Sequence, residues 1–254
     1  MSGADALGEP DRFCSGPFGR WQLEYVERAD STNALAGAEP TDRRVVVTDH
    51  QQAGRGRMGR IWETPAGEAL TMSATIDPGL PDVDWPWVPL LAGLVVAEAL
   101  DPYGLHASVK WPNDVLVDGL KVAGILVERV VSAQGQPLAV VGIGLNVHQQ
   151  ELPVPTATSL ARCGVRATRV DLLRGVLSGL EQVVSALPAD LGQLRSRFAG
   201  RCVTVGQVVD VHLPSGEVRR GRAREVDPRG CLVVDTEGAA LVVSAGDVVH
   251  VRPA

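Results

Sequence analysis

Apolar and polar positions alternate in WQLEYVE, near the start of the chain, a pattern typical of a half-buried β-strand. Strands are predicted in WQLEYVE, RVVVTDH and ALTMSATI. Between the first two lies ADSTNALAGAE, in which Ser31 or Thr32 is placed to cap a short helix. Further on, WPWVPLLAGLVVAEAL has apolar residues at helical spacing after a proline-rich start, so it predicts a longer helix.

The middle of the chain predicts more strands and then its longest helical stretch. SVKWPNDVLVDGLKVAGILVERV predicts strands joined by a tight turn at Asp118-Gly119. PLAVVGIGLNV is almost continuously apolar, as expected of an interior strand. Residues 169–198 predict a helix that is broken near Pro188, because proline cannot continue a helical hydrogen-bond ladder.

The pattern changes after Gly200, where short strands are separated by the turn signals PSGE, DPRG and TEG. Close, regular turns of this kind predict a small all-β module. We therefore expect three parts: a loose Gly- and Pro-rich tail over residues 1–20, a mixed α and β domain over 21–200, and the β-module over 201–254.

Composition narrows the class of protein. A chain of 254 residues with 45% hydrophobic residues can bury one large or two unequal cores. A net charge of −6 argues against a general nucleic-acid or membrane binder. The four cysteines lack metal-ligand spacing, the N-terminus has no apolar signal segment, and VPLLAGLVVAEAL is too short to span a bilayer. We expect a soluble cytoplasmic protein.

The segment QQAGRGRMGRIW contains G-x-G-x-x-G, the letter pattern of a dinucleotide-binding loop. In such folds the glycines open a helix, but here Pro65 and Gly67 would break one, and Asp77 precedes a Pro-Gly turn. The sequence therefore disfavours a Rossmann fold. Arginines alternating with glycines suit a phosphate site, because the backbone can approach closely and guanidinium groups match phosphate oxygens, although a solvated loop would look the same.

A second polar cluster is KWPND followed by LKVAGIL. Lys121 could be a residue of an edge strand that extends its amine to solvent, or a fixed ammonium facing an anion. Asn113 and Asp114 could form a turn, or could bind hydrated Mg²⁺ beside phosphates. Together with the arginine-glycine segment, this cluster outlines a site for an activated phosphate compound.

Five motifs carry a resemblance to the biotin protein ligase family: STN (31–33), QQAGRGRMGRIW, KWPNDV, KVAGIL and GIGLNV, in that order. The resemblance runs from about Trp21 to the C-terminus. It implies an α+β fold in which a mixed β-sheet catalytic domain, like that of class II synthetases, packs with helices and is followed by a small SH3-like β-barrel. It also implies an enzyme that uses ATP and Mg²⁺ to activate biotin as biotinyl-5′-AMP. The biotinyl group then passes to a lysine of the biotin carboxyl carrier domain of an acyl-CoA carboxylase.

The resemblance also implies a role for each matching residue. The catalytic group would be Lys121 between the biotin carboxylate and the α-phosphate, Arg57, and Asp114, which is also the candidate Mg²⁺ ligand. The biotin site would comprise Ser31, Thr32, Asn33, Gln51, Gly54, Arg55, Gly56, Arg57, Lys121 and Gly124. The ATP and adenylate site would comprise Arg57, Arg60, Trp62, Asn113 and Asn146. Without the resemblance, Ser31 and Thr32 would be taken as helix caps and Trp62 as core packing.

The chain departs from the family pattern at two points, and two alternative functions are considered. The chain leaves no room for an N-terminal winged helix, so we expect a monofunctional ligase without DNA or membrane binding; a homodimer is left open. Met58 stands where relatives often have a basic residue.

A lipoate-protein ligase shares the catalytic fold, but the GRGRMGR and KWPND pair favours biotin. A nucleic-acid-binding protein with an Arg/Gly loop is disfavoured by the acidic charge and the 4% aromatic content.

Overall fold

The structure, a computed structural model, describes residues 7, 19–213, 215–244 and 247–250. Its larger β-sheet has seven strands in the order β1-β2-β3-β7-β6-β5-β4. Only β1 and β2 run parallel; the other neighbours are antiparallel, so the sheet is mixed as predicted. The strands are β1 (Gln22–Ala29), β2 (Arg44–Gln51), β3 (Ala69–Ile76), β4 (Ser108–Lys110), β5 (Asp114–Val117), β6 (Leu120–Val131) and β7 (Pro137–Asn146).

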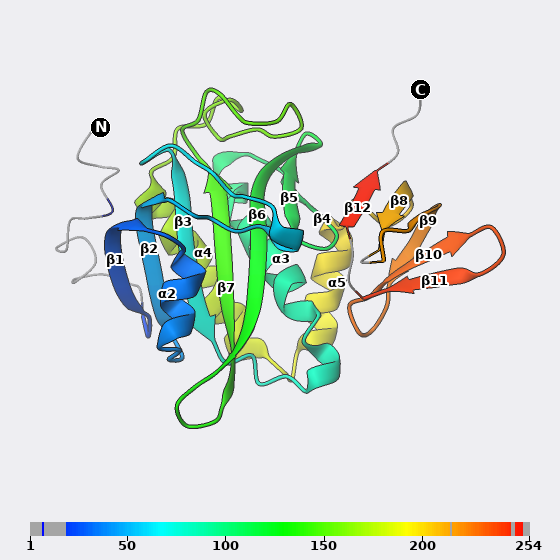
Figure 1. The fold of residues 1–254 in the computed structure, drawn as a ribbon, viewed down its shortest axis with the longest axis horizontal. Helices are drawn as coiled ribbons and strands as arrows, with labels where there is room; N and C mark the ends of the chain where they lie inside the picture. Colours follow the sequence, from blue (N-terminus) through cyan, green and yellow to red (C-terminus); the bar gives the residue numbers. More distant parts are fainter. Residues whose placement is uncertain (1–6, 8–18, 214, 245–246, 251–254) are drawn as a thin grey trace.

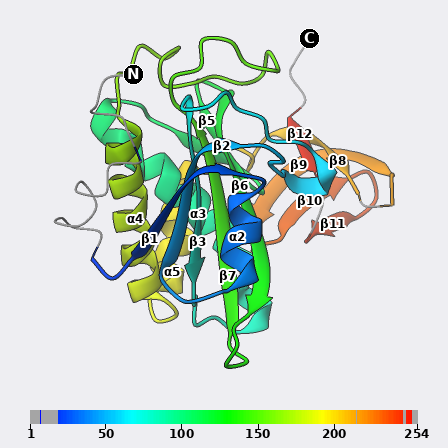
Figure 2. The same cartoon turned by 60° about the vertical axis from the view of Figure 1, so that its left-hand side comes forward.

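Helices cover both faces of this sheet (Figures 1 and 2). The short helix α2 (Thr32–Ala38) lies on one face, and α3 (Trp87–Ala99), α4 (Arg169–Ala186) and α5 (Leu191–Arg201) lie on the other. Helix α3 contacts β4, β5 and β6 as well as α4 and α5. Helix α3 is therefore enclosed by its neighbours, and most of its residues are buried. A helix in such a position needs apolar side chains on all sides.

The local signals in the sequence are confirmed. The side chain of Ser31 accepts a hydrogen bond from the backbone N–H of Ala34 and caps α2. Asp118 and Gly119 have φ values of 49° and 76°. Both lie in the left-handed region, as the two central residues of a tight hairpin turn do. One interpretation was wrong: Lys121 is not on an edge strand, because β6 lies between β5 and β7. No helix of the described part of the chain is long and apolar enough to span a membrane.

The second sheet has five antiparallel strands in the order β11-β10-β9-β8-β12, as the turn signals after Gly200 predicted. They are β8 (Val208–His212), β9 (Val218–Val226), β10 (Leu232–Thr236), β11 (Ala240–Val243) and β12 (Asp247–His250). Figure 1 shows this sheet beside β4 and α5. Most of the tail predicted over residues 1–20 lies outside the described residues; Leu7 is described and is buried.

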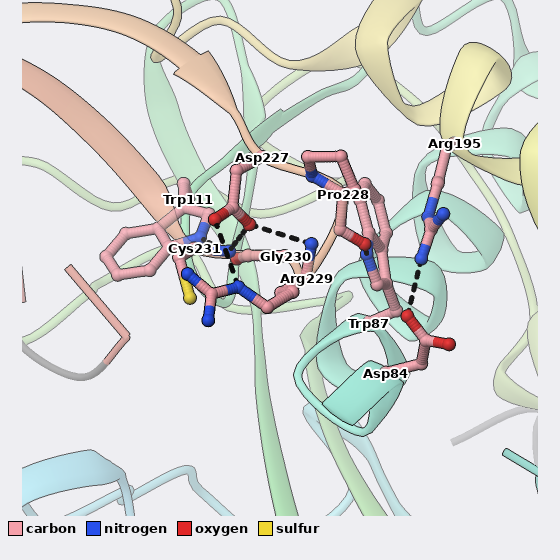
Figure 3. A network of polar contacts seen from close by, with 9 residues as sticks. All are labelled: Asp84, Trp87, Trp111, Arg195, Asp227, Pro228, Arg229, Gly230 and Cys231. Carbon is pink, nitrogen blue, oxygen red and sulfur yellow. Dashed lines mark hydrogen bonds and ion pairs between the residues drawn. The ribbon is translucent and has the colours of Figure 1, made fainter. Parts of the chain in front are cut away.

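Two buried tryptophans of the larger domain donate hydrogen bonds to the small sheet's connecting segment (Figure 3). Trp87 Nε1 donates to the carbonyl of Pro228 at 2.9 Å, and Trp111 Nε1 donates to that of Gly230 at 3.0 Å. In addition, the backbone N–H of Trp111 donates to Thr204 Oγ1 at 2.9 Å. Buried polar groups are costly unless paired, so these bonds fix the small sheet to the strand end that carries KWPND.

His250, on β12, supplies a pH-dependent contact at this interface. Its Nε2 lies 3.1 Å from Thr204 Oγ1, and burial, then the nearby charge of Lys110, lowers the pKa of His250 to about 4. The unfolded chain, in which histidine keeps its ordinary pKa near 6.5, therefore binds the proton more readily. This contribution to stability is present above about pH 6.5 and is lost as the pH falls toward about 4.

We expect the melting temperature of the protein to fall more steeply on acidification than that of His250→Gln, which has no proton to bind. Differential scanning fluorimetry of both proteins between neutral pH and about pH 4.5 measures the difference. The two curves should converge at the acid end. Parallel curves would show that His250 titrates normally in the folded protein.

Candidate active site

A cavity of about 110 Å³ lies on the face of the sheet that carries α2. Its floor is formed by β3, β6 and β7, and the segment between β2 and β3 closes over it, crossing in front of β7 and β6 in Figure 1. Most of the residues predicted for the site line this cavity: Ser31, Thr32, Asn33, Gln51, Arg55, Gly56, Arg57, Arg60, Trp62, Asn113, Lys121 and Gly124. Gly54, Asp114 and Asn146 are not among the lining residues.

One end of the cavity is a network of short, uncharged polar side chains at the start of α2. The backbone N–H and the hydroxyl of Thr32 both donate to Gln51 Oε1, at 2.9 and 3.2 Å. Ser73 Oγ lies 2.7 Å from Thr32 Oγ1 and donates to Asn33 Oδ1 at 2.6 Å. All four side chains are at least nine-tenths buried. Such a network holds donors and acceptors in fixed positions for an uncharged polar ligand.

Two members of this network were missed in the sequence. Ser73 has no exposed surface, and Glu128 Oε2 accepts a hydrogen bond from Asn33 Nδ2 at 2.6 Å. Gly142 belongs to the same arrangement, since a Cβ there would collide with the amide of Asn33. A weak signal was available for Ser73, which is one of three hydroxyl-bearing residues in the strand ALTMSATI. Glu128 carried none, because its pairing depends on the distance between α2 and β6.

The other end of the cavity carries charge. Lys121 Nζ lies 2.5 Å from Asp114 Oδ1, and Lys110 Nζ lies 4.0 Å from Asp114 Oδ2. The backbone of Lys121 is fixed, because its N–H donates to the carbonyl of Thr156 and its carbonyl accepts from the N–H of Thr158, both at 2.8 Å. The side chain of Lys121 therefore extends from a backbone that is held on both sides, and its catalytic role remains a prediction.

Asn113 joins KWPND to the neighbouring strand. Its side-chain amide donates to the carbonyl of Ile125, and the N–H of Ile125 donates to the carbonyl of Asn113, both at 2.9 Å. These bonds set the position of Asp114 opposite Gly124 in the sheet register. Asn113 thus has a positioning role in addition to lining the cavity.

The arginine-glycine segment forms a small hairpin and does not begin a helix, as the argument against a Rossmann fold predicted. The N–H of Trp62 donates to the carbonyl of Gly54 at 2.9 Å, and the N–H of Gly56 donates to that of Arg60 at 2.7 Å. Its tip is a single 3₁₀ turn over Arg57–Gly59, in which Met58 has a φ of 55° and a largely exposed side chain. A hairpin is tethered only at its base, so it can act as a lid.

Trp62 ends this hairpin and lies on the sheet. A Cβ at Gly144 would collide with its indole ring, and a Cβ at Gly124 would lie 3.2 Å from it. The two glycines face each other in the register of β6 and β7, so together they make a flat surface for an aromatic ring. Lys121 Nζ is 5.5 Å from the ring centroid. The glycines of the sequence motifs AGIL and GIGLN therefore belong to one surface, on which the ring of Trp62 packs.

Asn146 is engaged away from the cavity. Its Nδ2 donates to the carbonyl of Thr158 at 2.9 Å, and its Oδ1 accepts from Gln149 Nε2 at 3.1 Å. It is also buried, with 5% of its surface exposed. Contact between Asn146 and an adenine ring would require these bonds to break, and the role predicted for it remains a prediction.

The donor set suits a magnesium ion that arrives with its nucleotide. Within the described residues, no three His, Cys, Asp or Glu side chains are grouped as metal ligands. Mg²⁺ commonly keeps several waters and takes substrate phosphates with only one or two carboxylates. Asp114 is the carboxylate beside Lys121 and remains the candidate ligand.

Comparison with known proteins defines the class of protein. Residues 25–146 match the model of the Biotin/lipoate A/B protein ligase family. The chain is 39% identical to the biotin–[acetyl-CoA-carboxylase] ligase of Mycobacterium tuberculosis, over 95% of this chain and 94% of that protein. The chain therefore belongs to the biotin protein ligase family.

Two further comparisons agree with this assignment. The bifunctional ligase/repressor BirA of Bacillus subtilis is 29% identical over 85% of this chain and 69% of its own length. Among solved structures, the biotin protein ligase of Aquifex aeolicus in complex with biotin and ATP superposes with a TM-score of 0.78 and 26% identity. That match covers 91% of this chain and 99% of the Aquifex chain, so it includes both sheets. The fold predicted from the sequence is confirmed.

Proposed function

We propose that the protein activates biotin with ATP as biotinyl-5′-AMP and transfers the biotinyl group to a lysine of a biotin carboxyl carrier domain. The observation that carries this proposal is that the two ends of one cavity differ in chemical character. Its α2 end offers short neutral hydrogen-bonding groups, and its other end offers Lys121 beside the arginines of the hairpin. A ureido ring suits the first environment, and a carboxylate that must react with a phosphate suits the second.

In the first half-reaction an oxygen of the biotin carboxylate attacks the α-phosphorus of ATP, and pyrophosphate leaves. Two anions approach each other, so the site must offset their repulsion and the charge that develops at phosphorus. The fixed backbone of Lys121 and its position in the lining of the cavity support this role for its side chain, and Arg55, Arg57 and Arg60 can close over the phosphate from the hairpin. Mg²⁺, when bound with ATP, would supply further charge neutralisation at the phosphates, with Asp114 as its candidate protein ligand.

In the second half-reaction the acceptor lysine amine attacks the carbonyl of the mixed anhydride, and AMP leaves. Because the anhydride is already activated, the protein needs to position the amine and exclude water, and no nucleophilic Ser or Cys is required. The proposed acceptor is the carrier domain of an acyl-CoA carboxylase. This follows from the name of the Mycobacterium tuberculosis ligase.

We further propose that residues 21–200 form the catalytic domain and residues 201–254 an SH3-like module, in a protein of the cytoplasm. The end of α5 at Arg201 and the start of β8 at Val208 support the division. Cys163, Cys202 and Cys231 are free thiols, which is typical of a reducing compartment.

The function is tested by native mass spectrometry of the purified protein with MgATP and either biotin or lipoate. We expect a complex with biotinyl-5′-AMP, release of pyrophosphate only with biotin, and transfer to a carrier domain added afterwards. Formation of lipoyl-AMP instead would assign the lipoate reaction. The same spectra report whether two copies of the chain associate.

The hairpin should change its protease sensitivity on binding. Trypsin is expected to cut after Arg55, Arg57 or Arg60 in the protein alone, and biotin with ATP should suppress this cleavage, because closure of the hairpin over the ligand would shield these peptide bonds from the protease. Gly54, Gly56 and Gly59 add to the entropy cost of closure. Arg28, outside the hairpin, serves as the internal control site. Equal cleavage of the hairpin with and without ligands would contradict the lid.

Replacement of Arg57 by glycine should loosen the lid without removing the site. We expect Arg57→Gly to form the adenylate but to release it, so that lysines of a bystander protein such as serum albumin become biotinylated. Streptavidin blotting of albumin, compared with the unmodified protein and with Arg224→Gly on β9, measures the leak. Labelling no greater than that of the controls would show that Arg57 does not retain the adenylate.

A further inference from the structure

The side-chain amide of Asn33 is held in one orientation by two acceptors on β6. Its Nδ2 donates to Glu128 Oε2 at 2.6 Å and to the carbonyl of Leu126, which can only accept, at 3.3 Å. Gly142, the partner of Leu126 in the sheet register, leaves room for the amide, since a Cβ there would collide with Asn33 Oδ1. The amide oxygen of Asn33 is therefore the atom that faces Ser73.

The side-chain amide of Gln51 is fixed by the opposite kind of group. Its Oε1 accepts from the backbone N–H of Thr32 at 2.9 Å, and a backbone N–H can only donate. Its Nε2 lies on the side of Gly54, where a Cβ would collide with it. The oxygens of both amides thus face the hydroxyl groups of Ser73 and Thr32, which lie between them.

These two hydroxyl groups have too few hydrogens for their contacts. Ser73 Oγ lies 2.6 Å from Asn33 Oδ1 and 2.7 Å from Thr32 Oγ1. Thr32 Oγ1 in turn lies 3.2 Å from Gln51 Oε1. The amide oxygens only accept and each hydroxyl has one hydrogen, so two hydrogens serve three contacts. One contact therefore lacks a hydrogen, and Thr32, which lines the cavity, is left to accept an N–H from a ligand.

We propose that Glu128 is a positioning residue: by holding Nδ2 of Asn33, it keeps the hydroxyls of Ser73 and Thr32 short of hydrogen, and so selects a ligand that brings N–H groups. This role rests on the proposed biotin activation and gives it a basis for specificity. The ureido ring of biotin carries N–H groups, whereas the dithiolane ring of lipoate has none. If the amide of Asn33 were reversed, its NH₂ group would face Ser73, each contact would have its own hydrogen, and an N–H from the ligand would no longer be favoured.

The test compares biotin affinity among variants of Glu128 by isothermal titration calorimetry without ATP. Glu128→Lys offers Asn33 only donors, so it favours the reversed amide, whereas Glu128→Gln can still present an acceptor oxygen to Nδ2. Glu128 is exposed, so neither substitution should unfold the protein, and thermal melting checks this. Glu225→Lys on β9, at an exposed residue that does not line the cavity, is the matched control for the change of charge.

We expect Glu128→Lys to weaken biotin binding by about 10-fold or more, as follows when a buried hydrogen-bonding group loses its partner. Glu128→Gln should recover most of that loss, and Glu225→Lys should show none. In assays of pyrophosphate release, Glu128→Lys should raise the KM for biotin but leave kcat and the KM for ATP near the values of the unmodified protein. General damage to the site would instead change all three.

Three results would overturn the role of Glu128: unchanged biotin affinity in Glu128→Lys, an equal loss in Glu128→Gln, or an equal loss in Glu225→Lys. The first would show that Leu126 alone orients Asn33, and the other two would assign the effect to charge. Failure of the proposed function would appear differently, as a lack of biotin binding by the unmodified protein, and the role of Glu128 would fall with it.

Discussion

Replacing Lys121 by alanine is expected to lower the rate of adenylate formation by about 10²–10³-fold, the usual cost of removing a preorganised donor at a site of developing charge. The ammonium of Lys121 lines the cavity and is held by a strand whose backbone bonds do not involve its side chain. The fold should therefore remain intact. Biotin-dependent release of pyrophosphate measures the rate, and thermal melting checks the fold.

Lys110→Ala is the matched control for this experiment. Lys110 faces the same carboxylate of Asp114, but it does not line the cavity. We expect this variant to keep most of its rate. An equal loss in both variants would assign the effect to the charge balance at Asp114, and a near-normal rate in Lys121→Ala would contradict the assignment of Lys121 as the catalytic cation.

Replacing Trp111 by alanine is expected to lower the free energy of unfolding by about 3–5 kcal/mol, as large-to-small changes of buried aromatic residues do. Trp111 is 2% exposed and packs in the cluster that joins the two sheets. It precedes Pro112 in KWPND, so the site should be disturbed as well. Urea denaturation measures the change in stability, and pyrophosphate release measures the change in the site.

Trp111→Phe separates packing from hydrogen bonding at this position. The phenyl ring retains much of the apolar contact but leaves the carbonyl of Gly230 without its 3.0 Å donor. An unsatisfied buried acceptor costs about 1–3 kcal/mol, so this variant should lie between the alanine variant and the unmodified protein. A loss below about 1 kcal/mol in Trp111→Ala would contradict the stabilising role given to its side chain between the two sheets.

The elements of the fold were predictable because each has a local physical cause. The alternation in WQLEYVE, the cap at Ser31, the Asp118-Gly119 turn and the break before Pro188 act within a few residues of the chain. The motifs around Gln51, Lys121 and Gly142 were visible for the same reason, since each is contiguous. They identified the cavity, and most of the residues expected there do line it.

The relations between these elements were decided only by the tertiary structure. Lys121 proved to be on an interior strand, because strand order depends on pairings between segments far apart in the sequence. Glu128 is part of the polar network because its side chain accepts a 2.6 Å hydrogen bond from Asn33. Asn146 does not line the cavity, because its side chain is hydrogen-bonded to Thr158 and Gln149. No local pattern encodes such pairings.

The glycines and the lysines illustrate the division most clearly. The sequence by itself determined that glycines occur at residues 124, 142 and 144, and that the chain has only two lysines. Only the tertiary structure decided that Trp62 lies on Gly124 and Gly144, that Asn33 fills the space at Gly142, and that both lysines face Asp114. The physical reason is separation along the sequence. The identity of a side chain is fixed by its position in the chain, but its contacts depend on how strands that are far apart in the sequence pack together.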